Sequence, residues 1–248
     1  MAIRKFLDSG LVPCVLAISI FSGSTVWADV DDFSCGALQN AYGPYDYRSD
    51  RDKLGVVESF HFTPEVANLI RGKSGHIGGD LDYTLRAFPN HPRALMAMVQ
   101  LGEREKKTKV FGAQYSVECY LHRAIRFRAD DATAKMIYAN YLVKNGRSKD
   151  ALKQLNDAAS LNDSNTSLAY NIALVYLELK EYDQALAYAH KAYQAGFPLP
   201  GLRDRLKRVG KWREFVPESE ASSSKAHEES AVAKDMPDAE DAPAGLGR

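Results

Sequence analysis

The sequence predicts an all-α fold in which helical hairpins stack into a solenoid, with an irregular segment before them and a disordered tail behind them. The strongest evidence is residues 170–192, where two amphipathic runs at helical spacing flank a short charged turn. Small residues at Ala173, Ala185 and Ala192 would let two helices approach closely while larger side chains fill the gaps beside them. We therefore expect an antiparallel hairpin in this stretch.

The same pattern recurs 34 residues earlier in the chain. Six positions correspond, and the residues that occupy them in the earlier copy are Tyr138, Ala139, Leu142, Gly146, Ala151 and Ala158. Self-similarity at this period is typical of helical solenoids, because each helix pair buries its apolar face only against its neighbours. The recurrence therefore predicts at least two such hairpins, stacked side by side.

The composition is that of an ordinary globular chain, with 32 basic and 32 acidic residues and 45% apolar residues. The balanced charge lacks the basic excess that is typical of nucleic-acid-binding proteins. We expect no nucleic-acid partner.

Residues 1–28 have the outline of a secretory signal peptide. Arg4 and Lys5 precede an apolar run at 11–21, and the small residue Ala28 offers a cleavage site. The run is shorter than the roughly 18 apolar residues that cross a bilayer, and no later run approaches that length. We expect a periplasmic protein, cleaved after Ala28 and then without a transmembrane segment; the alternative is an uncleaved anchor.

Cleavage would leave two cysteines, Cys35 and Cys119, in an oxidising compartment. A single disulfide is the simplest arrangement there, and in the chain-entropy model it would contribute about 4–5 kcal/mol. The alternative is two separate buried thiols.

Residues 29–62 show no lasting helical period and predict an irregular segment. Tyrosines cluster with Gly43 and Pro44 in the stretch 41–48, which is rich in turn-forming residues. Because the tyrosines are too apolar to lie free in water, we expect the segment to cover the first helices of the solenoid. The alternative is an aromatic contact site for a partner.

A helical repeat domain is expected over residues 63–214. Thr63 and Pro64 predict a helix start, and this helix should run to about Arg71 before the glycine-rich stretch 72–79 breaks it. That stretch lacks the Lys-Ser/Thr ending of a phosphate-binding loop, so we interpret it as a connector. Further helices are expected at 80–88, 91–105, 114–128, 132–145, 149–161 and 201–209.

The connector 106–112 is longer than a hairpin turn needs. It combines three lysines with Val110 and Phe111, which makes it a candidate contact loop. The alternative is a solvated turn with one apolar anchor.

The last helix and the tail carry opposite charges. The helix at 201–209 is basic and would give the solenoid a polar end. Residues 215–248 carry an excess of acidic over basic side chains and no aromatic residue beyond Phe215, a composition that predicts disorder.

No catalytic or metal-binding motif is present in the sequence. The chain contains no His-Glu-x-x-His, Gly-x-Ser-x-Gly or Cys-x-x-Cys, and no two of the six histidines share a helical face at i, i+3 or i+4. We expect neither an enzyme nor a cofactor. An enzyme whose site is assembled from distant residues remains a further alternative.

From about Leu81 to Pro198 the chain resembles the tetratricopeptide repeat family, most closely in the last two repeats. The short stretches 43–48 and 79–86 are similar to sequences in a group of exported bacterial repeat proteins. The resemblance implies a scaffold that binds a segment of another envelope or secreted protein in a concave groove lined by the first helix of each repeat. The groove positions that it selects are Met136, Asn140, Val143, Lys144, Tyr170, Asn171, Leu174, Leu177 and Glu178.

Asn140 and Asn171 also resemble the asparagines of the subgroup that grips a peptide carboxylate. Met136 replaces the first lysine of that clamp, and only Arg205 could supply a basic partner. The alternative to groove binding is a structural subunit that uses its convex face or its N-terminal segment.

Overall fold

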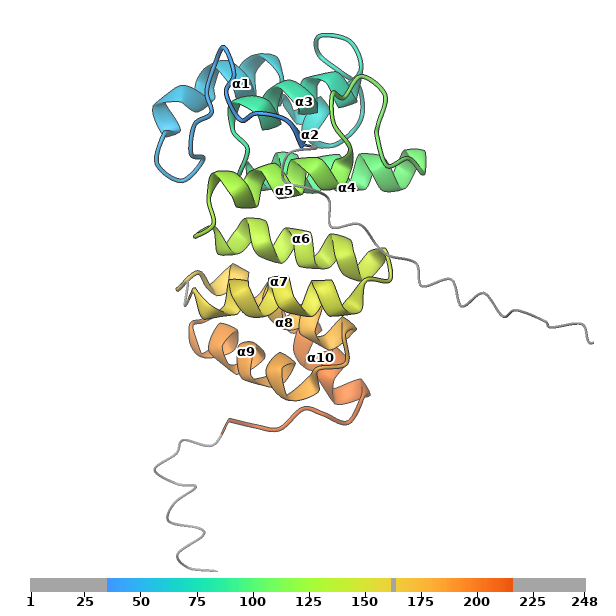
Figure 1. Ribbon diagram of the computed structural model, residues 1–248. Helices are drawn as coiled ribbons and strands as arrows, with labels where there is room; N and C mark the ends of the chain where they lie inside the picture. The colour runs from blue at the N-terminus through green and yellow to red at the C-terminus, as the bar shows by residue number, and fades with distance from the viewer. Residues whose placement is uncertain (1–34, 162–163, 216–248) are drawn as a thin grey trace, which may run out of the picture.

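The computed structural model describes residues 35–161 and 164–215 (Figure 1). The expected signal peptide and nearly all of the acidic tail lie outside the described residues. Within the described ranges there are ten α-helices, one 3-10 helix and no strand, which confirms the all-α fold class. The elements are η2 (Arg51–Lys53), α1 (Leu54–Phe60), α2 (Pro64–Ala67), α3 (Ile77–Ala87), α4 (Pro92–Glu105), α5 (Val117–Phe127), α6 (Ala132–Lys144), α7 (Ser148–Ser160), α8 (Thr166–Glu178), α9 (Tyr182–Gln194) and α10 (Gly201–Arg208).

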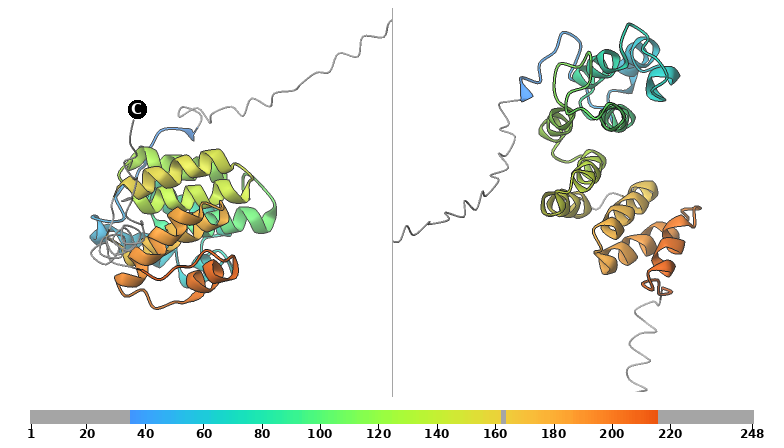
Figure 2. Two further views of the ribbon diagram at one scale, coloured as in Figure 1. Left: turned by 90° about the horizontal axis from the view of Figure 1, so that it is seen from below. Right: turned by 90° about the vertical axis from the view of Figure 1, so that its right-hand side faces the viewer.

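The helices pack as successive hairpins. The pairs α6/α7 and α8/α9 make the most extensive contacts, and α4, α6 and α8 form a continuous row of first helices. Figure 2 (right) shows the pairs following one another along a curved path. The helical solenoid expected from the 34-residue recurrence is therefore confirmed.

The hairpin of α8 and α9 forms for the reasons that its sequence suggested. Asn165 caps α8 by accepting a hydrogen bond from the Leu168 N–H at 3.1 Å. Ala173 and Ala185 are fully buried where the two helices meet, so the backbones approach closely. The Tyr176 hydroxyl donates to Asn156 of α7 at 2.7 Å and joins this hairpin to the preceding one.

The N-terminal part of the solenoid differs from expectation at three boundaries. Helix α1 lies inside the segment expected to be irregular. It buries only Leu54 and Val57, a stripe too short to produce a recognisable period. Helix α2 ends at Ala67 instead of Arg71, because Leu69 adopts a left-handed backbone with φ 56°.

Helix α3 begins at Ile77, inside the glycine-rich stretch that was expected to be a connector throughout. Gly78 lies against the connector that follows α4, and an added Cβ there would lie 2.2 Å from the Phe111 carbonyl oxygen. The glycine therefore serves a close approach of two chain segments within a helix, a role that the sequence pattern does not reveal.

The tyrosine-rich segment covers the first helices, as expected. Tyr45 packs on Phe88 with ring centroids 5.5 Å apart, and its N–H donates to the Ala87 carbonyl at 2.8 Å. Asp46 is buried beneath this cover. Burial alone would raise the pKa of its carboxyl, but hydrogen bonds from Arg48 and Asn90 outweigh burial and hold that pKa well below its usual range.

Helix α10 closes the other end of the stack. Leu202 and Leu206 are fully buried against α8 and α9, whereas Lys207 and Arg208 are exposed. The expected polar end is present.

Candidate protein-binding groove

A groove runs across the row of first helices. It has a cavity of about 160 Å³, to which α4 contributes one residue, α6 three and α8 four. The lining residues are Met96, Met136, Ile137, Asn140, Asn171, Leu174, Val175 and Glu178. Five of the nine positions selected by the family resemblance are therefore brought together on one surface.

The floor of the groove is apolar and adaptable. Met136 and Leu174 are buried or half-buried, while Met96 is 43% exposed. Methionine side chains are flexible and polarisable, so they can adjust to differently shaped apolar partners. An exposed methionine beside a leucine provides a place for an incoming apolar side chain.

Two side-chain amides, those of Asn140 and Asn171, also line the groove. The side chains of Asn140 and Asn171 have no hydrogen-bond partner among residues 35–161 and 164–215. Each amide carries both donors and an acceptor, which match the N–H and C=O groups of a peptide backbone. The groove therefore combines an apolar contact with unused polar groups.

The rim of the groove holds charges that are already paired with one another. Glu178 lies 3.8 Å from the guanidinium of Arg205, and both side chains are about two-fifths exposed. Outside the cavity lining, Lys144 donates to Glu103 at 2.9 Å. Since Arg205 and Lys144 both have acidic neighbours, neither is an isolated cation for a ligand carboxylate.

Four of the sequence-selected positions lie elsewhere. Tyr170 is nearly buried, stacks on Phe197 at 4.2 Å between ring centroids, and accepts a hydrogen bond from the Leu202 N–H at 3.2 Å. It is a packing residue that holds α10 against α8. Leu177 is buried in the core, and Val143 and Lys144 lie at the end of α6, outside the cavity lining.

Met96 is a groove residue that the sequence reasoning missed. It comes from α4, whose repeat departs from the register of the last two because of the long connector behind it. The available signal was that Met96 is a large apolar residue outside the helical spacing of Leu95, Met98 and Leu101.

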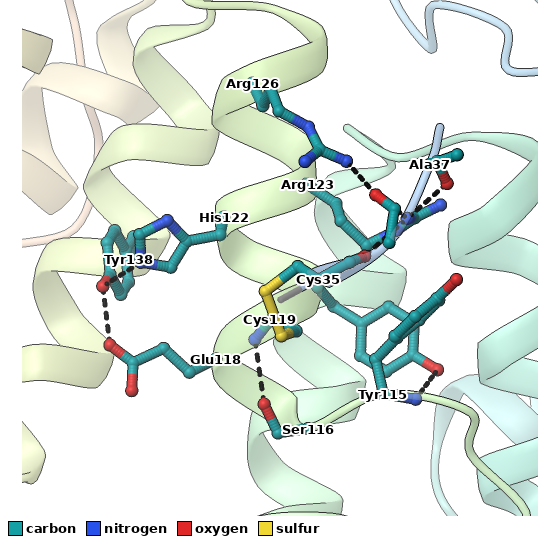
Figure 3. Close-up of a disulfide and its surroundings, with 12 residues drawn as sticks. Cys35, Ala37, Tyr115, Ser116, Glu118, Cys119, His122, Arg123, Arg126 and Tyr138 are labelled. Carbon is teal, nitrogen blue, oxygen red and sulfur yellow. Dashed lines mark hydrogen bonds between the residues drawn. A yellow bond between two sulfur atoms is a disulfide. The ribbon is translucent and has the colours of Figure 1, made fainter. Parts of the chain in front are cut away.

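The N-terminal segment is tied to α5 beside the groove-forming helices (Figure 3). Cys35 and Cys119 form a disulfide with their Cα atoms 5.2 Å apart, which confirms the expected pairing. The buried guanidinium of Arg123 donates to the carbonyl oxygens of Cys35 at 2.9 Å and Ala37 at 2.8 Å, and it lies over the Tyr115 ring. Burial lowers the pKa of this arginine.

A second polar cluster links α5, α6 and α7. The Tyr138 hydroxyl lies 2.7 Å from Glu118 Oε1 and 2.9 Å from His122 Nε2 (Figure 3). Arg147 forms an ion pair with the same carboxylate. Burial raises the pKa of Tyr138, which keeps its hydroxyl protonated. Because these contacts join side chains of neighbouring helices, we interpret the cluster as a structural link between repeats.

The described residues provide neither a group of three or more His, Cys, Asp or Glu side chains that could hold a metal ion nor a helix long and apolar enough to cross a membrane.

The middle of the chain matches a known protein family. Residues 114–192, which cover α5 to α8 and most of α9, match the model of the family described as anaphase-promoting complex, cyclosome, subunit 3, a tetratricopeptide-like repeat family. No curated protein and no solved structure matches the chain.

Proposed function

From the premise that residues 114–192 are repeats of the tetratricopeptide type, we propose that the protein is a non-enzymatic scaffold that binds a segment of another protein in its groove. Repeats of this kind serve mainly as interaction surfaces. The observation that carries the proposal is the groove itself, in which Met96, Met136 and Leu174 lie beneath the two unpartnered amides.

Binding would proceed by burial on a preformed surface. An apolar side chain of the partner would enter between Met96 and Leu174, and Asn140 and Asn171 would hydrogen-bond its backbone. Because the groove residues belong to packed helices, little ordering of the scaffold opposes binding. No bond of the partner is broken in this mechanism.

We place this scaffold in the cell envelope, with another envelope or secreted protein as its partner. The disulfide between Cys35 and Cys119 supports this location, since such bonds persist in oxidising compartments. The signal-like sequence of residues 1–28 supports it independently. Sequencing the N-terminus of the purified native protein tests the location: Asp29 should come first, and a retained Met1 would contradict it.

The groove is tested by crosslinking in living cells. A photo-crosslinking amino acid at the exposed position Asn171 should capture a defined partner, whereas the same amino acid at exposed Lys153 of α7 should not. Adding Met96→Glu should reduce the yield at Asn171 about tenfold, because a carboxylate would face the apolar floor.

Three outcomes would contradict groove binding. Capture could be equal from Lys153, or unaffected by Met96→Glu in a protein with an unchanged melting temperature, or absent from both positions. Equal capture from Lys153 would favour the alternative in which a structural subunit uses its convex face.

A further inference from the structure

A second cleft opens where α4 and α6 end and α5 begins. Its volume is about 260 Å³, larger than that of the groove cavity, and the two share no lining residue. The residues that line it are Val99, Gly102, Glu103, Lys106, Lys107, Thr108, Val117, Tyr141 and Asn145. It lies about 10 Å farther along α4 than Met96, from the helical rise between positions 96 and 103.

The long connector between α4 and α5 forms one wall of this cleft. The turns of the other two hairpins span only residues 145–147 and 179–181, whereas this connector spans residues 106–116. Val110 anchors it in the core, while Phe111 is 59% exposed and packs on His76. The structure therefore agrees with a turn that has one apolar anchor, and its lysine-bearing start is left at the mouth of the cleft.

The cleft is held open by backbone contacts. The Val117 N–H donates to the Thr108 carbonyl at 2.7 Å, and the Lys107 N–H donates to the Gly102 carbonyl at 3.0 Å. A Cβ on Gly102 would lie 2.8 Å from Val117 Cγ2, so the glycine permits this close packing. The shape does not depend on a mobile loop closing over a ligand.

The acidic residue at the cleft is paired with a lysine, whereas two other lysines there have no acidic partner among the described residues. Glu103 is neutralised by Lys144, whose ammonium lies 2.9 Å from its carboxylate. Lys106 and Lys107 are exposed, and their ammonium groups have no acidic partner in the part of the chain that the structure describes. The floor between them is formed by Val99, Val117 and the half-buried Tyr141.

We propose that this cleft binds an acidic segment of a partner protein. An aliphatic or aromatic side chain of that segment inserts between Val99 and Tyr141, and an adjacent carboxylate pairs with Lys106 and Lys107. The volume is just below the roughly 300–1,000 Å³ of small-molecule sites, so it suits one or two inserted side chains. A free phosphate would leave the apolar floor unused.

The experiment selects ligands without assuming their sequence. A displayed library of random linear peptides is panned on the full-length, disulfide-bonded protein, and enriched peptides are labelled for fluorescence polarisation. Enriched peptides should carry an acidic residue next to an apolar one. The double variant Lys106→Glu/Lys107→Glu should weaken their binding about tenfold or more, since two attractions become repulsions.

Matched variants separate this cleft from the groove. Lys149→Glu/Lys153→Glu makes the same charge change at two exposed positions within α7 and should leave the affinity unchanged. Asn171→Ala/Leu174→Ala alters the groove and should also leave it unchanged. Added salt should weaken binding to the parent protein.

The proposal is overturned if no peptide is enriched, or if the enriched peptides lack the acidic and apolar pair. It is also overturned if binding is lost equally in the Lys149/Lys153 variant, or only in the groove variant. A groove that fails its own crosslinking test would leave these outcomes unaffected, because the two sites share no lining residue.

Discussion

Single side chains decide how the repeats are joined, and His91 is the clearest case. It is fully buried between the Tyr47 and Phe62 rings, and its Nδ1 accepts a hydrogen bond from the Ala94 N–H at the start of α4. Burial lowers the pKa of His91 to about 3. The imidazole of the folded protein is therefore neutral at pH values well above 3.

Acid should destabilise the protein through this residue. In the unfolded chain His91 binds a proton near its ordinary pKa of 6.5, whereas the folded chain binds it only near 3. Protons thus favour the unfolded state between these values, and the loss from pH 7 to pH 4.5 should be about 2–3 kcal/mol. Urea unfolding at a series of pH values measures it.

The matched variant is His91→Asn, which keeps a capping acceptor but does not titrate. Its unfolding free energy should fall less steeply over the same pH range, and Glu58, 3.4 Å from the His91 Nε2, stays in place in both proteins. Parallel pH profiles for the two proteins would exclude His91 as the source of the acid sensitivity.

For single residues, the sequence could predict which cysteines pair, but not which side chains are covered by a neighbouring element. The pairing of Cys35 with Cys119 followed from their number and the expected compartment. The family register selects Tyr170 for the groove, yet Phe197 stacks on its ring and Leu202 of α10 hydrogen-bonds its hydroxyl, so the side chain is buried. Whether a helix face is open depends on what packs against it, and a repeat pattern does not contain that information.

The elements themselves show which local signals are strong. The helices of the last two repeats, α6 to α9, begin and end within a few residues of the expected positions, since caps such as Asp131 and the left-handed Gly146 mark their ends. Helices α1 to α3 are short and hold fewer periodic apolar positions, so their boundaries differed. Long-range contacts, rather than local preference, determine where they start.

Two adjacent glycines of α3 provide a test of this point. Gly78→Ala should lower the free energy of unfolding by about 2 kcal/mol or more, because the added Cβ would meet the Phe111 carbonyl oxygen at 2.2 Å. Gly79→Ala should be neutral or stabilising by up to about 1 kcal/mol, since its Cβ has 3.6 Å of space and alanine favours a helix. Thermal and urea unfolding of both variants measure the difference.

Equal effects at the two glycines would show that the contact between α3 and the connector is looser in solution than in the structure. An increase in stability for Gly78→Ala would contradict the prediction directly, because it would mean that helix preference outweighs the contact with Phe111.

At the scale of the whole molecule, the disulfide joins the tyrosine-rich cover to the helices. Replacing both cysteines by serine should lower the free energy of unfolding by about 4–5 kcal/mol in the chain-entropy model, since the bond closes a loop with a sequence separation of 84. The cover should nevertheless stay in place, because Arg123 and Arg126 still bind the carbonyls of residues 35–37.

Hydrogen exchange together with urea unfolding checks both halves of that prediction. Amides of residues 41–48 should remain protected in the serine variant under native conditions, as they should in the parent protein treated with reductant. Complete loss of protection would mean that the arginine contacts do not hold the cover without the disulfide.

The disulfide also separates a part of the chain that a pulling force can extend from a part that it cannot. The crosslinked ring runs from Cys35 to Cys119 and includes α1 to α4, whereas α6 to α10 follow it in the chain. Under tension applied at the termini, the later hairpins can unravel one after another, but the ring cannot lengthen until a sulfur bond breaks. The residues between Cys35 and Cys119 should therefore not be extended when the molecule is pulled. The length of the fully stretched chain would show how many residues the disulfide holds back.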